Sequence, residues 1–62
     1  MKELDTVKLL IETSTVEKGS IGTIVEVWEK DKSYEVEFLD KDGFVIDCIC
    51  VTAKNLELVK EY

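Results

Sequence analysis

The chain has 62 residues, and its 14 acidic residues against eight lysines give a net charge of −6. This length predicts one domain over residues 1–62 and excludes a second domain or a large cofactor cavity. Because the chain has no arginine and no histidine, nucleic acid is disfavoured as a partner, and histidine-based catalysis and zinc sites are excluded. No stretch resembles a membrane span or a signal peptide, so we expect a soluble cytoplasmic protein.

The expected elements are short strands, because β-branched and aromatic residues alternate with polar residues along most of the chain. The first strand is expected over residues 6–12, where Val7, Leu9 and Ile11 share one face. Residues 13–20 are mostly polar and predict a loop.

The second strand is expected from Ile21 to about Trp28, and residues 29–32 predict a turn. The third strand, over residues 33–39, has the clearest alternation of apolar and acidic side chains, so one set faces the core and the other faces solvent. The inward set is Tyr34, Val36 and Phe38, and the outward set is Glu35 and Glu37.

Residues 40–43 predict a tight hairpin turn, because Gly43 tolerates positive φ and follows an aspartate. The fourth strand is expected over residues 44–51, and the pattern leaves open which of its faces is buried. Because Asp47 is charged, the residues that alternate with it along the strand are favoured as the inward set. That set is Phe44, Ile46, Cys48 and Cys50.

Residues 52–55 predict a single helical turn with the Thr52 hydroxyl as its cap. Leu56, Leu58 and Val59 then predict a short closing strand. Five strands with one helical turn before the last predict an all-β fold, a small five-stranded SH3-like barrel, because closure leaves fewer wet apolar faces and unpaired edges. An open meander and a dimer that shares the sheet are the alternatives.

Three segments carry a resemblance to known proteins: residues 18–27, residues 34–38 and the Asp42-Gly43 pair. Together they resemble a small bacterial family of uncharacterised domains with the pattern Gly-x-x-Gly-Thr-Val, then Tyr-x-Val-x-Phe, then a closing Leu. They are also similar to the KOW and nitrile-hydratase-β-like SH3 barrels. The resemblance implies this fold and a stand-alone bacterial protein without an assigned activity. Some members of such families look like antitoxin or immunity partners of toxins.

The same family pattern favours Ile49 and Val51 as the inward residues of the fourth strand, against the set favoured by Asp47. A bend or bulge in this strand would reconcile the two. Cys48 and Cys50 are interpreted as small hydrophobic residues in a reducing compartment. A disulfide between them would be strained, and no other cysteine or histidine completes a metal site.

The outer face of the central hairpin is the candidate binding site. With Tyr34, Val36 and Phe38 in the core, the inward neighbours on the second strand are expected to be Val27, Val25 and Thr23. Glu26 then lies opposite Glu35 for a four-residue loop or opposite Glu37 for a two-residue loop, and Ile24, Trp28 and Leu39 share this face. The predicted partner-binding residues are Glu26, Trp28, Glu35, Glu37 and Leu39.

Residues 26–42 hold seven acidic residues and three lysines, so the hairpin carries −4 of the net charge. This favours a partner with a basic surface, with Trp28 as an aromatic anchor. The alternative is an ordinary solvated strand face whose charges prevent aggregation.

No catalytic, cofactor or metal site is predicted. Glu26 with Glu35 or Glu37 is the one candidate pair for acid–base catalysis, and an exposed strip provides no enclosed pocket for it. Gly43 follows Asp40 too closely for a calcium loop, and residues 19–22 lack the helix and lysine of a phosphate loop.

We therefore expect a non-catalytic protein-interaction module, of the antitoxin or immunity type, that binds a basic protein through the acidic hairpin face. A KOW-like nucleic-acid-associated module and a structural or dimerising barrel are the alternatives, and both a monomer and a homodimer fit the sequence.

Overall fold

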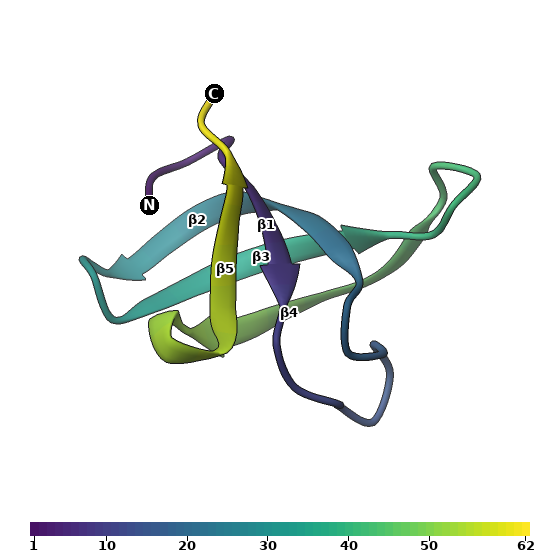
Figure 1. The fold of residues 1–62 in the computed structure, drawn as a ribbon. Coiled ribbons are helices and arrows are strands. Elements are labelled where there is room, and N and C mark those ends of the chain that lie inside the picture. The colour runs from purple at the N-terminus through teal and green to yellow at the C-terminus, as the bar shows by residue number, and fades with distance from the viewer.

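The computed structural model describes all 62 residues, which form a single antiparallel sheet with the strand order β4-β3-β2-β1-β5 (Figure 1). The strands are β1 (Thr6–Leu9), β2 (Ile21–Glu29), β3 (Ser33–Leu39), β4 (Val45–Thr52) and β5 (Leu56–Lys60), and the 3-10 helix η1 (Ala53–Asn55) precedes β5. The predicted all-β fold with five strands and one helical turn before the last is confirmed. The single helix, η1, is far too short to cross a membrane.

The sheet is strongly bent, so that β5 and β1 cross in front of β3 and β4 (Figure 1). This bend encloses one hydrophobic core, to which all five strands and the loop after β1 contribute. β4 and β5 are the two edges of the sheet. The core residues are Val7, Leu9, Val16, Ile24, Tyr34, Val36, Phe38, Val51 and Leu56.

β3 has the predicted boundaries and the predicted inward set, since Tyr34, Val36 and Phe38 are all buried. Glu35 and Glu37, which alternate with them, are half-buried on the outer side. The period-two pattern of this strand therefore reports its two faces correctly.

A β-bulge in β2 changes the predicted partners of β3. Ile24 lies opposite Val36 and Glu26 lies opposite Glu35, so Val25 is an extra residue without a partner. The extra residue moves Ile24 into the core, where it is fully buried, and leaves Val25 exposed. The expectation that Val25 faces the core and Ile24 faces solvent is thus wrong.

Beyond the bulge, Gly22 takes the inward position that was predicted for Thr23, and it lies opposite Phe38. A Cβ atom on Gly22 would approach the Phe38 ring and the Glu37 carbonyl oxygen to 2.8 Å. The glycine therefore lets β2 approach the aromatic ring closely. Thr23 turns to the outer face, opposite Glu37.

β1 is shorter than predicted, because it ends at Leu9 and leaves Ile11 exposed. The chain leaves the sheet there, and the Leu10 amide donates to the Asn55 carbonyl at 2.9 Å. The following loop returns Val16 to the core, and the Val16 amide donates to the Thr13 hydroxyl at 2.8 Å.

Two register shifts interrupt the β2–β3 pairing, at Val25 and at Trp28, and a bulge in β4 decides which face of that strand is buried. Phe38 pairs with Asp47 and Leu39 pairs with Val45, so Ile46 is the extra residue. Val51 is buried and Ile49 packs against the core, as the family pattern predicts. The alternative inward set is wrong, because Phe44, Ile46, Cys48 and Cys50 are all exposed.

The turn before β5 differs in one detail from its prediction. η1 begins after Thr52, but the Thr52 hydroxyl makes no capping hydrogen bond to the backbone and instead accepts from Asn55 Nδ2 at 3.1 Å. Leu56 is buried at the start of β5, whereas Leu58 and Val59 are exposed.

Candidate functional site

The outer side of the β2–β3 hairpin brings the predicted carboxylates together. Glu26 lies directly opposite Glu35, which is the arrangement predicted for a four-residue loop. The indole Nε1–H of Trp28 donates to Glu35 Oε1 at 2.9 Å, and Trp28 remains 62% exposed. The indole thus crosses from β2 to β3 and presents its ring to solvent beside a carboxylate.

Glu37 and Leu39 continue the same side of β3 away from this pair. Glu37 lies opposite Thr23, and Leu39 lies opposite Ile21. All five predicted residues therefore share one surface, which we call the acidic face; Ile24, predicted beside them, belongs to the core. The acidic face comprises Glu26, Trp28, Glu35, Glu37 and Leu39.

No lysine of the chain neutralises the glutamates of the acidic face. The three ion pairs of the structure are Lys2–Asp5, Lys8–Glu57 and Lys32–Glu29. The Lys32–Glu29 pair lies at the β2–β3 turn. The same turn contains Asp31, which has a positive φ of 64°. The charge of the acidic face is therefore left for solvent ions or for a partner.

β4 extends this surface with two thiols that sequence reasoning left unplaced. Cys48 lies opposite Glu37 and Cys50 opposite Glu35, and both cysteines are exposed and unpaired. The Cys48 thiol donates to Glu35 Oε2 at 3.4 Å. Burial, this hydrogen bond and the neighbouring carboxylates raise the pKa of Cys48 above its ordinary value.

The Glu35 carboxylate thus lies at the centre of the surface. One oxygen accepts a hydrogen bond from the Trp28 indole on β2, and the other accepts one from the Cys48 thiol on β4. These two contacts hold the carboxylate over the sheet. A fixed carboxylate beside an exposed indole is suited to binding a lysine or arginine side chain by a charge-assisted hydrogen bond and by cation–π contact.

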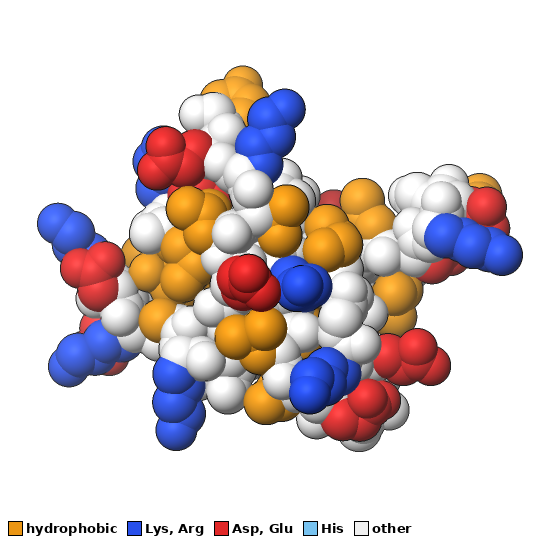
Figure 2. Space-filling model, viewed as in Figure 1, with side chains coloured by type: hydrophobic (Ala, Val, Ile, Leu, Met, Phe, Trp, Pro, Cys, Tyr) orange, Lys and Arg blue, Asp and Glu red, His pale blue; other side chains and the backbone are white.

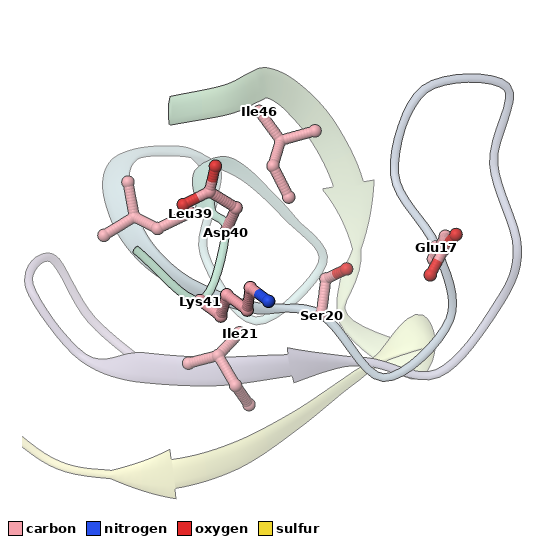
Figure 3. Close-up of a pocket in the computed structure, with 7 residues that line it drawn as sticks. All are labelled: Glu17, Ser20, Ile21, Leu39, Asp40, Lys41 and Ile46. Carbon is pink, nitrogen blue, oxygen red and sulfur yellow. The ribbon is translucent and has the colours of Figure 1, made fainter. Parts of the chain in front are cut away.

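A hollow of about 590 Å³ lies at the opposite end of the same surface, next to Leu39. Ile21, Leu39 and Ile46 line it with apolar side chains, and Asp40 and Lys41 from the β3–β4 turn stand beside them (Figure 3). Sequence reasoning missed Ile21 and Ile46, because unbroken alternation of β2 places Ile21 inward and only the bulge at Val25 turns it outward, and because Ile46 is itself the extra residue of the β4 bulge. The hollow can accept an apolar side chain of a partner.

The face over β1 and β5 has a different character, because acidic and basic side chains alternate there with hydrophobic ones (Figure 2). Lys8 of β1 pairs with Glu57 of β5 at 3.5 Å. This pair links the charges of β1 and β5, whereas Glu26, Glu35 and Glu37 of the hairpin form no ion pair.

Asp5 is a buried carboxylate outside this surface, and its role is structural. It accepts hydrogen bonds from the Lys2 amide, the Lys2 ammonium group and the Tyr62 amide at 3.0, 2.9 and 3.0 Å. The Lys2 and Tyr62 hydrogen bonds lower the pKa of Asp5 to about 2. The carboxylate thereby ties the two ends of the chain together (Figure 1). Asp5 and Tyr62 are 57 residues apart, so no local sequence pattern predicts this contact.

No group of three or more carboxylates and thiols is arranged to hold a metal ion. Residues 3–58 match a protein family described as a domain of unknown function (DUF4926). The chain belongs to the DUF4926 family. The DUF4926 match includes every residue of the acidic face and confirms the predicted membership of an uncharacterised family. No curated protein and no solved structure matches the chain.

Proposed function

We propose that this DUF4926 domain is a non-catalytic protein-interaction module that binds a basic protein through the acidic face. In the finer form of this proposal, the fold is an SH3-like barrel of a bacterial cytoplasmic protein that acts as an antitoxin or immunity-type partner. The five-stranded bent sheet and the helical turn before β5 support the barrel. The antitoxin role rests on the resemblance to small bacterial domains alone.

The observation that carries the proposal is the pairing of Glu26 with Glu35, neither of which forms an ion pair with a lysine. Like charges directly opposite each other on a sheet destabilise it, by a few tenths of a kcal/mol or about 1 kcal/mol. A basic group placed between the two carboxylates replaces this repulsion with attraction, so binding relieves a local defect of the free protein.

Trp28 and the hollow supply the apolar contacts that such an interface needs. Tryptophan is enriched among the residues that dominate binding energy, and Trp28 is well exposed beside the carboxylates. The hollow at Ile21, Leu39 and Ile46 lies at the other end of the surface. The partner would therefore have a basic centre between two apolar contacts.

The KOW-like alternative has weaker support, because nucleic-acid binding depends on clustered positive charge. The eight lysines are scattered along the chain, and three of them are in ion pairs with acidic residues. Retention on a heparin or RNA column at low salt would favour this alternative.

Affinity capture from a lysate of the source organism, with two charge-matched double variants, tests the proposal. Glu35→Lys with Glu37→Lys changes the acidic face, whereas Glu3→Lys with Glu61→Lys changes exposed glutamates elsewhere. Each reversal adds two charges, so both double variants carry −2 in place of −6. Capture of one basic protein by the wild type and by the Glu3/Glu61 variant, but not by the Glu35/Glu37 variant, is expected. Equal capture by both variants would refute the proposal.

A further inference from the structure

β4 is an unusually unprotected edge of the sheet. It is eight residues long, it pairs only with β3, and it contains one charged residue, Asp47, and no lysine or proline. None of the backbone hydrogen bonds outside the strand ladders involves residues 45–52. The other edge, β5, has five residues and includes Glu57 and Lys60. Natural sheets usually protect a long edge with charges or proline, because an open edge pairs with other strands.

The direction of the free backbone groups follows from one contact. The Cys48 amide donates to Asp47 Oδ1 at 2.8 Å rather than to β3. Since successive residues of a strand direct their backbone groups to opposite sides, the amides and carbonyls of Cys48 and Cys50 face the open edge. Apart from the Cys48 amide, these groups have no partner in the protein.

The side chains of the same two residues lie on the acidic surface. Cys48 is opposite Glu37, and Cys50 is opposite Glu35. A strand added beside β4 would place its side chains two strand spacings, about 9.6 Å, from those of β3. The small thiols leave the space between them open to a long basic side chain. Glu35 already extends toward β4, since its Oε2 is 3.4 Å from the Cys48 sulfur.

We propose that the free edge of β4 takes up an extended segment of the basic partner as a sixth strand of the sheet. Two basic residues, two positions apart in this segment, lie over Cys48 and Cys50 and contact Glu37 and Glu35. Main-chain hydrogen bonds give affinity, and the carboxylates select for positive charge. The charge of the partner rests on the proposed function; the strand addition is a separate claim about how it binds.

A second copy of the chain does not fit this edge as well. Pairing of two β4 strands would join two chains of net charge −6 and would set their glutamate rows on one continuous surface. Like charges on neighbouring strands destabilise such a pair. Charge complementarity therefore favours a basic segment as the occupant.

The test is an NMR titration of the 15N-labelled protein with the peptide Thr-Lys-Val-Lys-Thr-Lys-Val-Thr and two N-methylated forms. The two forms are methylated on alternate amides: one form on the amides that would face β4, and the other form on the amides that would face away from it. The unmodified peptide should slow hydrogen exchange of the Cys50 amide. Methylation of the set that faces β4 should weaken binding about tenfold or more, because it removes at least two hydrogen bonds, and methylation of the other set should not.

Protein variants give a second measurement. Cys50→Pro removes the edge amide and should abolish peptide binding, whereas Cys50→Ser retains the amide and should bind as the wild type does. Where Cys50→Pro fails to fold, the methylated peptides decide the question alone. Equal binding of both methylated forms, exchange protection on β5, self-association through β4 or absence of peptide binding would each overturn strand addition.

The two proposals fail in different ways. Peptide binding that is lost in the Glu35→Lys/Glu37→Lys variant but is insensitive to methylation would overturn strand addition and leave the acidic face as the binding site. Binding that depends on methylation but is unchanged in that variant would overturn the role of the glutamates in the proposed function.

Discussion

Glu26 and Glu35 lie directly opposite each other on the outer side of the β2–β3 hairpin, and neither carboxylate is paired with a lysine. Like charges directly opposite each other on a sheet repel, and salt screens the repulsion because both carboxylates are open to solvent at least in part. The free protein therefore carries a local destabilising interaction at the position where the proposed partner binds.

Replacement of Glu26 with Gln should stabilise the protein by about 0.5 kcal/mol at low salt, because it removes this repulsion. The free energy of unfolding is obtained from urea titrations at low and at high salt, and the gain should shrink at high salt. Glu3→Gln, which removes an exposed charge elsewhere, is the control. Equal stability of Glu26→Gln and the wild type at low salt would contradict the assigned register.

Gly22→Ala should be strongly destabilising, because the new Cβ meets the Glu37 carbonyl oxygen and the Phe38 ring at 2.8 Å. A loss of about 3 kcal/mol in unfolding free energy is expected for such overpacking. Gly43→Ala is the matched control, since Gly43 has a positive φ of 86° but open space around it. Gly43→Ala should lower the free energy of unfolding by only about 1 kcal/mol. A larger loss of stability for Gly43→Ala than for Gly22→Ala would argue against the packing of β2 on Phe38.

The contribution of Asp5 to stability should depend on pH. Its pKa in the folded protein is lowered from 3.8 to about 2, so the stabilisation is complete above the ordinary pKa and is lost as pH falls through the folded value. Asp5→Asn should therefore be less stable than the wild type at neutral pH, and the difference should shrink between about pH 4 and pH 2. A difference that stays constant over this range, measured by thermal unfolding, would contradict the proposed contacts with Lys2 and Tyr62.

The contact between Glu35 and Cys48 predicts a slow thiol. Burial and the Glu35 carboxylate raise the pKa of Cys48, so Glu35→Gln, which removes the second cause, should speed alkylation of Cys48 by about threefold at mildly alkaline pH. The measurement is made in a Cys50→Ser background, with Glu57→Gln on β5, at the other edge of the sheet, as a control. An unchanged alkylation rate in the Glu35 variant would show that the 3.4 Å contact does not persist in solution.

Sequence reasoning succeeded where the alternation is unbroken. In β3 every inward residue is apolar and the residues between them are acidic, so Tyr34, Val36 and Phe38 could be placed without knowledge of their partners. The same alternation placed Glu26 opposite an acidic residue but left Glu35 and Glu37 open, and the structure selects Glu35, with a register shift at Trp28 beside the turn.

The bulge in β2 could not be predicted, because it separates residues of the same chemical kind, whereas a bulge in β4 was expected but its position was not. Ile24 and Val25 are both β-branched and apolar, so hydrophobicity does not indicate which one enters the core. In β4 both faces are largely apolar, and the extra residue Ile46 exchanges them. Gly22 was a usable signal, since a glycine inside a strand often marks a close approach of another chain segment.

The residues of the candidate site were likewise predicted where the alternation is regular and missed where they depend on a bulge. The carboxylates and Trp28 were placed correctly from one hairpin, whereas Cys48, Cys50 and Ile46 depend on the register of β4 against β3. That register is fixed by the bulge and by the packing of Ile49 and Val51 on the core; the family pattern favoured these two residues, but the alternation of the strand did not.

The most direct test of the central claim is to map the surface that the captured partner covers on the 15N-labelled protein. We expect line broadening at the Trp28 indole N–H and at the amides of Glu26, Glu35 and Glu37, with salt reversing the effect. Broadening confined to β1 and β5, with the Trp28 indole signal unchanged at saturating partner, would contradict the account.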